Sequence, residues 1–431
     1  MKVLMFGWEF PPHISGGLGT ACYGLTKGLS KIQNLDVIFV VPKAHGDEQN
    51  DSVRLIGANR IPVSSKNIKT QGFLKKMNLL EVGVRLIPYL SPEQYEEKEG
   101  EITMNLAGLE SKIRTNAEGL IEFSGGYGPK LFHEIANYSV VASVLGGELD
   151  FDIIHAHDWL TYPAGMAAKS VSGKPLVIHV HATDFDRSGG NVNPAVYEIE
   201  KAGMIAADRI ITVSNLTRKI VIEKYGIDPS KVFTVYNAVE PIVEKENLNV
   251  NKPFDEKIVT FLGRITMQKG PEYFIEVAHK VLQKMKNVRF VMAGSGDMLN
   301  KMIARAAKLG ITDRFHFTGF LGGEDVYRMY YMSDVYVMPS VSEPFGITPL
   351  EAMQSNVPVI ISHQSGVAEI LHHAVKVDFW DIEAMADAIY GILNYPSLYT
   401  TFTNLGKSEV EGLKWENSAL KVKEVYESVL N

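Results

Sequence analysis

The chain has 431 residues, of which 45% are hydrophobic and 22% charged, so it can bury large cores and is not generally disordered. Its 43 basic and 50 acidic residues give a formal net charge of −7, which argues against a large nucleic-acid-binding face. The single cysteine, Cys22, excludes an intrachain disulfide and any zinc or iron–sulfur site built from cysteines.

Targeting signals are not evident in the sequence. The first residues are apolar, but they reach Pro11 and Pro12 too early for a signal peptide. No apolar stretch approaches the roughly 18 residues of a membrane helix. We therefore expect a cytoplasmic protein without integral membrane contact, and the sequence does not predict its oligomeric state.

Short β-branched runs alternate with helical patterns in the first half of the chain. The pattern predicts a helix over Leu18–Lys31 and strands at Met1–Phe6, Asp36–Val41, Asp152–His155, Pro175–Val180, Arg209–Val213 and Val232–Val235. Such an alternation predicts a parallel sheet with helices on both faces. The polar stretch 61–126, with possible strands near 83–89, breaks the alternation and is expected to be an insertion.

A polar, Asn-rich stretch at 241–255 predicts a linker, after which the alternation resumes. The later strands are expected at Ile258–Leu262, Val288–Met292, Arg314–Phe317, Asp334–Met338 and Val357–Ile361, and a final helix at Trp415–Leu430. We predict an α/β fold with two doubly wound domains, residues 1–240 and 256–414, that face each other across a cleft. Ligands of such sheets bind outside the carboxyl ends of the strands.

The usual nucleotide fingerprints are absent. Gly17-Leu18-Gly19 is followed by Cys22 where a third glycine should stand, and no GxxxxGK[ST] occurs, which disfavours a conventional NAD site or a Walker ATPase. Gly16 and Gly17 nevertheless lie between a strand and a helix, where free N–H groups can bind an anion. A tight turn without a ligand is the alternative.

Two cations follow the first strand of the second domain. Arg264 and Lys269 lie five residues apart around a turn. They could converge on one diphosphate, which Arg binds bidentately and Lys binds as a point charge. Two solvated surface charges are the alternative.

The segment from Glu343 to Glu351 follows another strand and enters a helix. Thr348 fits an N-cap, Pro349 the first helical position and Glu351 the third, so the pattern predicts a capping box. That gives Glu351 a structural role. Glu343 has none, and the N–H groups around Gly346 point towards whatever Glu343 faces.

Two histidine pairs, His155/His157 and His179/His181, each end a strand. Residues two apart on a strand share a face, so each pair could chelate a metal, as in metal-dependent hydrolases. One catalytic or binding histidine, or packing in the core, are the alternatives. Asp184-Phe185-Asp186 imitates the DxD of metal-dependent sugar transferases, but we expect no metal there.

Five motifs occur in order: GWEFPPHISGGLG, HAHDW, YNAVE, GRITMQKG and EPFGITPLE, the last with two glutamates separated by seven residues. Together they resemble retaining glycosyltransferases with two Rossmann-like domains (GT-B), and among them glycogen and starch synthases. The resemblance implies transfer of glucose from UDP- or ADP-glucose to an α-1,4-glucan, without cofactor or metal. It also implies that the helix beginning with WENSA, within 415–431, folds back onto the first, acceptor-side domain.

The resemblance also implies residue roles. Arg264 and Lys269 would hold the diphosphate, Glu343 the sugar hydroxyls beside the reacting carbon, and Glu351 the ribose hydroxyls. The donor would also be met by backbone groups of two glycine-containing segments: Gly16, Gly17, Phe345, Gly346, Ile347 and Thr348.

In the first domain, the resemblance places His157 against the donor sugar, and Asn237 and His181 near the acceptor. The stretch from His13 to Thr20 lacks the lysine and the acidic residue usual in bacterial glycogen synthases. It therefore also suits transferases that act on small sugars, lipids or cell-surface polysaccharides. A metal-dependent hydrolase built on the histidine pairs, and a GT-B epimerase, stay open as alternatives.

Overall fold

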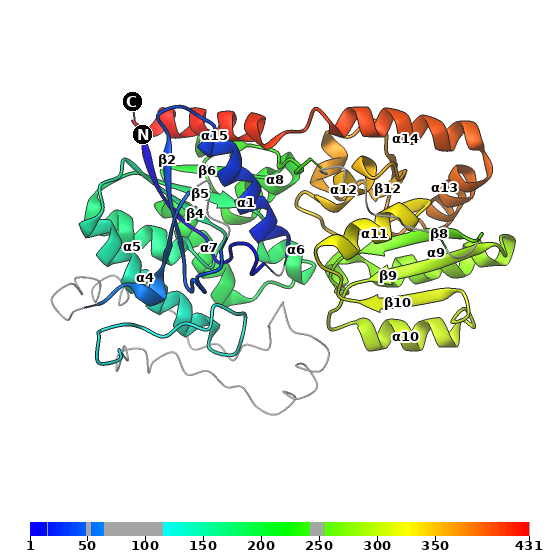
Figure 1. Ribbon diagram of the computed structural model, residues 1–431, viewed down its shortest axis with the longest axis horizontal. Helices are drawn as coiled ribbons and strands as arrows, with labels where there is room; N and C mark the ends of the chain where they lie inside the picture. Colours follow the sequence, from blue (N-terminus) through cyan, green and yellow to red (C-terminus); the bar gives the residue numbers. More distant parts are fainter. Residues whose placement is uncertain (15, 49–52, 64–114, 242–251, 253–254, 431) are drawn as a thin grey trace.

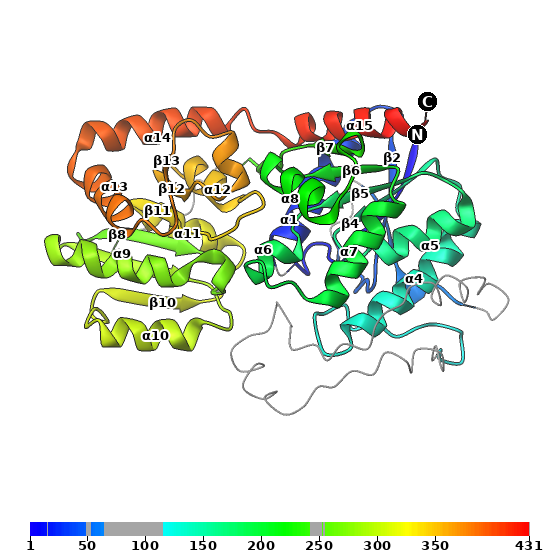
Figure 2. The same ribbon diagram turned by 180° about the vertical axis from the view of Figure 1, so that it is seen from behind.

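The computed structural model describes residues 1–14, 16–48, 53–63, 115–241, 252 and 255–430. It contains two parallel β-sheets flanked by helices, which confirms the predicted α/β class with two Rossmann-like domains (Figures 1 and 2). The possible strands near 83–89 and most of the expected linker 241–255 lie outside the described residues.

The first sheet has seven strands in the order β3-β2-β1-β4-β5-β6-β7, and each neighbouring pair is parallel. Its elements are β1 (Lys2–Phe6), α1 (Gly17–Ser30), β2 (Asp36–Val41), β3 (Arg54–Gly57), η1 (Ala58–Arg60), α4 (Leu131–Glu148), β4 (Ile153–His157), α5 (Tyr162–Ser172), β5 (Leu176–Val180), α6 (Asp184–Ser188), α7 (Pro194–Ala206), β6 (Arg209–Thr212), α8 (Asn215–Tyr225), η3 (Pro229–Lys231) and β7 (Val232–Thr234).

The second sheet has six strands in the order β10-β9-β8-β11-β12-β13, again parallel. Its elements are β8 (Lys257–Leu262), η4 (Met267–Lys269), α9 (Pro271–Lys284), β9 (Val288–Ala293), α10 (Leu299–Lys308), β10 (Phe315–Gly319), α11 (Glu324–Met332), β11 (Val335–Met338), α12 (Thr348–Gln354), β12 (Val359–Ser362), η5 (Gly366–Glu369), β13 (Val375–Val377), α13 (Ile382–Asn394) and α14 (Pro396–Val410), followed by α15 (Trp415–Leu430).

Strand β1 shows how the sequence builds the first core. Leu4 and Phe6 face the apolar cluster that includes α4 and α5, whereas Val3 and Met5 face the cluster that includes α1 and α15. All four side chains are fully buried. Apolar residues on both faces of a strand are what a parallel sheet between two helical layers requires.

Helix α15 lies on α1 of the first sheet, although it follows the second sheet in the chain (Figure 1). Two glycines of α1 allow this close approach. A Cβ at Gly24 would lie 2.2 Å from the Trp415 indole, and a Cβ at Gly28 would lie 2.6 Å from the Trp415 carbonyl oxygen. The Ser418 hydroxyl also donates to the Tyr236 carbonyl at 2.7 Å.

In each sheet, successive strands are added first on one side of the starting strand and then on the other side. In the first sheet this switch lies between β1 and β4, and in the second between β8 and β11. A crevice forms where two crossover connections leave adjacent strands in opposite directions, and ligands of doubly wound sheets bind there. The segments after β1, β4, β8 and β11 are therefore the places to look for a site.

Candidate functional site

The turn after β8 and the loop after β11 meet through a pair of opposite charges. The Lys269 ammonium forms an ion pair with the Glu343 carboxylate. The Glu343 residue is only 6% exposed, and the Ser340 hydroxyl donates to the same carboxylate at 3.3 Å. Glycine makes this approach possible, because a Cβ at Gly270 would lie 2.0 Å from the Pro339 carbonyl oxygen.

Arg264 belongs to the same turn as Lys269. Its guanidinium donates to the side-chain oxygen of the buried Gln268 at 3.1 Å. Strands β8 and β9 approach closely just before it, since a Cβ at Gly294 would lie 1.9 Å from the Gly263 carbonyl oxygen. Two cations thus leave one turn at the switch point of the second sheet.

The loop that carries Glu343 is held by its backbone. The Glu343 N–H donates to the Gln364 carbonyl at 2.9 Å, and the Gly366 N–H donates to the Glu343 carbonyl at 2.8 Å. Gly346 has φ +101°, which favours glycine, and a Cβ there would lie 3.2 Å from Glu343 Cγ. The loop therefore folds back towards Glu343, and Phe345, Ile347 and Thr348 lead from it into α12.

The predicted capping box is wrong. Helix α12 begins at Thr348 with Ile347 as N-cap, and no side chain caps it. The Thr348 hydroxyl oxygen instead accepts a hydrogen bond from the Tyr336 hydroxyl at 2.8 Å. Because Thr348 is already helical, Glu351 lies one position beyond the place from which a capping-box carboxylate reaches back.

Glu351 points to a tyrosine instead. Its carboxylate accepts a hydrogen bond from the Tyr330 hydroxyl at 3.3 Å. Burial raises the pKa of the Glu351 carboxyl from 4.5 to about 7, although the Tyr330 hydrogen bond acts in the opposite direction. This acid is consequently poised between its neutral and charged forms near neutral pH.

In the first domain, Gly16 is the N-cap of α1 and Gly17 is its first residue, at the end of the segment that joins β1 to α1. Both are exposed, and a Cβ at either position would meet no atom within 4 Å. The first turn of α1 contains no acidic side chain. No side chain of this turn therefore adds negative charge at the helix terminus, which suits it to an anion.

All four histidines of the two pairs form one cluster at the ends of β4 and β5. Neighbouring rings stack, with centroids 4.2 Å apart for His155–His157 and 4.4 Å apart for His179–His181. His157 Nδ1 and His181 Nε2 are 2.9 Å apart and share a hydrogen bond. Burial lowers the pKa of each of these four rings, so they are neutral at neutral pH.

The two domains touch beside these segments. The Ser342 hydroxyl, next to Glu343, donates to the Asp186 carboxylate of α6 at 2.6 Å. The Tyr236 and Phe345 rings lie 6.4 Å apart between centroids, which places the segment with the buried Asn237 beside the Glu343 loop. Helix α6 lies on the side of the first domain that faces the second in both views (Figures 1 and 2).

Known proteins resemble both domains. The family model described as Glycosyltransferase Family 4 matches residues 109–242, and the model described as Glycosyl transferases group 1 matches residues 243–409. An uncharacterized glycosyltransferase of Methanocaldococcus jannaschii is 28% identical, covering 99% of this chain and 98% of the relative. A glycogen synthase of Mycobacterium tuberculosis is 22% identical, covering 99% and 94%.

Solved structures share the fold. Sucrose-phosphate synthase from Thermosynechococcus elongatus matches with a TM-score of 0.70 at 18% identity, covering 99% of this chain and 98% of that one. HepE from Anabaena in complex with UDP-glucose matches with a TM-score of 0.63 at 14% identity, covering 99% and 100%. The two adjoining family models match residues 109–409 between them. The chain therefore belongs to the glycosyltransferases, and the solved structures show that it has the GT-B fold.

The structure of this glycosyltransferase brings some of the predicted residues together. Lys269 contacts Glu343, with Arg264 on the same turn, and His157 contacts His181. The glycines of α1 and Asn237 lie on the first domain, as the histidines do. The roles of all these residues in a reaction stay predictions.

The sequence analysis did not predict the side chains that stabilise the site's loops and the contact between the domains. The Asp184 carboxylate accepts the Asn193 N–H at 2.5 Å, and the Asp186 carboxylate accepts the Thr183 N–H at 2.8 Å. Both acids of the DxD segment therefore stabilise local turns, and Asp186 also reaches Ser342 of the other domain. Nothing in the sequence marks Ser342, because its partner lies 156 residues away.

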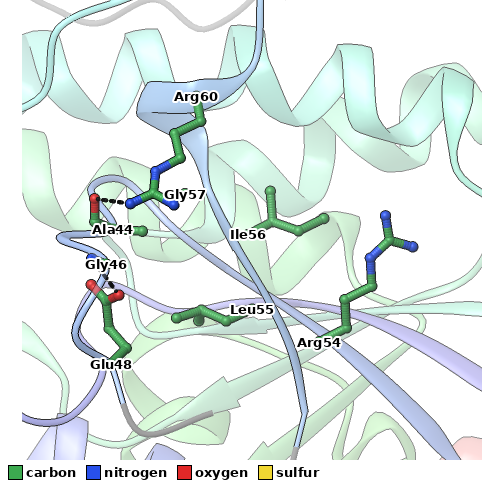
Figure 3. A pocket seen from close by; sticks show the side chains of 8 residues that line it. All are labelled: Ala44, Gly46, Glu48, Arg54, Leu55, Ile56, Gly57 and Arg60. Atoms are coloured by element: carbon green, nitrogen blue, oxygen red, sulfur yellow. Dashed lines mark hydrogen bonds between the residues drawn. The ribbon is translucent and has the colours of Figure 1, made fainter.

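A separate hollow lies at the outer edge of the first sheet, between β3 and the segment after β2 (Figure 3). Its volume is about 360 Å³. Polar groups in it bind each other, since Arg60 donates to the Ala44 carbonyl at 3.3 Å and the Gly46 N–H donates to Glu48 at 2.8 Å. None of the predicted site residues lines it.

Within the described ranges, none of the helices of this glycosyltransferase combines the length and the apolar character needed to cross a membrane.

Proposed function

We propose that this glycosyltransferase transfers a glucosyl unit from UDP- or ADP-glucose to a hydroxyl of an α-1,4-glucan, with retention at the anomeric carbon. The Lys269–Glu343 ion pair, with Arg264 on the same turn at the switch point of the second sheet, is the observation that carries the proposal. The similarity to a glycogen synthase over 99% of this chain supports the acceptor. The similar HepE structure with UDP-glucose supports the donor class.

Donor binding would exchange the partners of this ion pair. The diphosphate of a nucleotide sugar carries two negative charges, which match the two positive charges of Arg264 and Lys269. Once Lys269 turns to phosphate oxygens, the Glu343 carboxylate is free to accept hydrogen bonds from the sugar hydroxyls. Backbone amides at Gly346 and at the N-terminus of α1 supply further donors to the sugar and the phosphates.

Transfer breaks the bond between the anomeric carbon and the diphosphate oxygen. Negative charge then grows on the diphosphate and positive charge on the sugar. Arg264 and Lys269 stabilise the former, as fixed donors do in an oxyanion hole. A phosphate oxygen takes the proton of the acceptor hydroxyl while the acceptor oxygen bonds to the carbon on the same face, so neither a side-chain nucleophile nor a metal is required.

His157 suits a position beside the sugar. Burial lowers the pKa of its ring, so the ring is neutral at neutral pH and does not repel the developing positive charge. Domain closure through the contact between Asp186 and Ser342 would exclude water, which otherwise hydrolyses the donor.

A panel of donors and acceptors tests the proposal. UDP-glucose and ADP-glucose are each incubated with maltooligosaccharide, a monosaccharide or no acceptor, with and without a chelator, and released nucleotide is measured. We expect release that depends on maltooligosaccharide and not on a divalent cation. Nucleotide binding without release under any condition would contradict transfer and favour an epimerase.

A small-sugar acceptor is the second candidate. The stretch from His13 to Thr20 lacks the lysine and the acid of bacterial glycogen synthases, and sucrose-phosphate synthase is among the similar structures. Release that depends on the monosaccharide, with none for maltooligosaccharide, would support this candidate and contradict the glucan.

A further inference from the structure

Cys22, the only cysteine in the sequence, lies near two histidines of the histidine cluster. One ligand atom from each of Cys22, His157 and His181 can be chosen so that all lie within 4.8 Å of one another. We propose that these three side chains bind one Zn²⁺ ion, and that this ion inhibits the enzyme. Cys22 comes from α1, and the two histidines come from the ends of β4 and β5, so the ion would tie the helix to the sheet.

The burial of these side chains is the first observation behind this site. Among the described residues, His157 Nε2 and His181 Nδ1 are buried and have no hydrogen-bond partner, and His155 and His179 also leave ring nitrogens unpaired. His157 is 0% exposed and Cys22 is 1% exposed. These outer nitrogens can carry the ring protons while the facing pair, His157 Nδ1 and His181 Nε2, binds an ion.

The surrounding charge favours a cation. The carboxylates of Asp158 and Glu9 act on the Cys22 thiol through their negative charge. Asp158 Oδ1 also accepts the backbone N–H of His181 at 2.7 Å, which fixes the strand end that carries this ligand. A divalent ion would offset this negative charge and stabilise the thiolate.

The ligand set indicates the metal. One thiolate with two imidazoles is typical of zinc, with Zn–N bonds of about 2.0–2.1 Å and a Zn–S bond of about 2.3 Å. His157 Nδ1 and His181 Nε2, now 2.9 Å apart, would need to part by about half an ångström for tetrahedral angles. Their shared proton moves to an outer ring nitrogen and the thiol loses its proton, so one proton is released per ion.

A second set, His155, His157 and His179, also places its ligand atoms within 4.8 Å. However, His155 Nδ1 is already paired with the Tyr426 hydroxyl at 2.5 Å, and the His155 and His179 rings are parallel to within 7°. Lone pairs of parallel rings run side by side and do not converge, whereas the His157 and His181 rings are tilted by 39°. His181 is also partly exposed, which offers the ion a way in.

We expect inhibition because His157 would serve both the ion and the donor sugar. This expectation rests on the proposed function, whereas metal binding does not. An ion held by the buried His157 would fix the side chain that we place beside the donor sugar. His157 belongs both to the set with Cys22 and to the set with His155. An ion in one set therefore takes a ligand from the other.

Cobalt substitution tests the site in the full-length, metal-free chain. We expect one Co²⁺ to bind with a thiolate-to-cobalt charge-transfer band, and Zn²⁺ to displace it. Cys22→Ser should lose the band and at least about 10–100-fold in Zn²⁺ affinity, since even outer-shell changes cost that much. His179→Leu is the matched control, because it removes the second set and leaves the first intact.

No charge-transfer band in the wild type would overturn the site, even if Cys22→Ser fails to fold. Loss of metal binding in His179→Leu but not in Cys22→Ser would also overturn it. In the transfer assay, Zn²⁺ should inhibit the wild type, a chelator should restore activity, and Cys22→Ser should resist. If cobalt binds but Zn²⁺ leaves the transfer activity unchanged, the inhibition is refuted. If the enzyme is inactive with every donor, the proposed function fails but the cobalt result still stands.

Discussion

Lys269 and Glu343 neutralise each other at the meeting point of two segments that follow β8 and β11. Their side chains are 21% and 8% exposed, so the pair is largely shielded from water. We assign Lys269 to the diphosphate of the donor and Glu343 to its sugar. Before the donor binds, these two side chains hold each other in place. The structure is therefore organised for binding while neither charge is left alone in a poorly solvated place.

Removing one member of this pair should destabilise the fold. Lys269→Met leaves the Glu343 carboxylate without its counter-charge, and we expect a loss of about 1–3 kcal/mol in the free energy of unfolding. The value lies below the roughly 3–5 kcal/mol of a fully buried pair because Lys269 retains some exposure. Adding Glu343→Gln should restore most of the stability, measured by chemical denaturation.

Activity should not return with stability. Both the single and the double variant should lose about 10²–10³-fold in turnover, the cost of one oxyanion-hole donor. A double variant that regains turnover along with stability would show that the pair is structural and has no part in transfer.

Arg264 should also stabilise the diphosphate during glucosyl transfer. Arg264→Met should lower turnover by a similar factor of about 10²–10³. Arg305→Met is a suitable control, because Arg305 pairs with Glu276 at 2.6 Å on the outside of the second domain. Equal activity of the two variants in the nucleotide-release assay would remove Arg264 from the site.

Glu351 should make donor affinity depend on pH. Its pKa is raised to about 7, and acceptance of hydrogen bonds from two ribose hydroxyls needs the charged form. Donor affinity should therefore increase as the pH rises through 7, by up to about tenfold per pH unit below that value. Calorimetry between pH 6 and about pH 8 measures it.

Glu351→Gln provides the comparison. The variant should bind the donor more weakly at high pH and with little pH dependence. It should also be relatively more stable at high pH, because a raised carboxyl pKa stabilises the fold at low pH and that contribution is lost as the pH rises through about 7. A wild-type affinity that is flat with pH would refute the role of Glu351.

The histidine cluster should make the stability of the fold sensitive to acid. The pKa of His179 is lowered in the folded state, so the unfolded chain binds more protons below about pH 6.5 and stability falls there. His179→Leu should reduce this dependence by up to about 1.4 kcal/mol per pH unit. At higher pH it should be neutral or stabilising, since both ring nitrogens of His179 are buried and have no partner in the part of the chain that the structure describes.

Denaturation curves at several pH values check this expectation. A His179→Leu variant with the same acid dependence as the wild type would show that the ring takes up its proton in the folded state as easily as in the unfolded one.

The alternation of strands and helices was enough to predict the two parallel sheets, but not every strand. Strands β3 and β13 were missed, because Arg54–Gly57 and Val375–Val377 are too short to show a period. The helix over Trp415–Leu430 was predicted with its bounds, since its apolar positions recur at helical spacing.

Site features that depend on distant contacts could not be predicted. The capping box failed because Tyr336, on the preceding strand, takes the Thr348 oxygen. The spacing of His155 and His157 put two rings on one face of a strand. Only the pairing of β4 with β5 joins them to His179 and His181, and that pairing is a property of the sheet order.

A crystal structure with UDP-glucose or ADP-glucose tests the central claim most directly. The account predicts a diphosphate bound by Lys269 and Arg264, and a Glu343 carboxylate that accepts hydrogen bonds from the glucose hydroxyls. A donor bound elsewhere, with the Lys269–Glu343 ion pair intact, would contradict it.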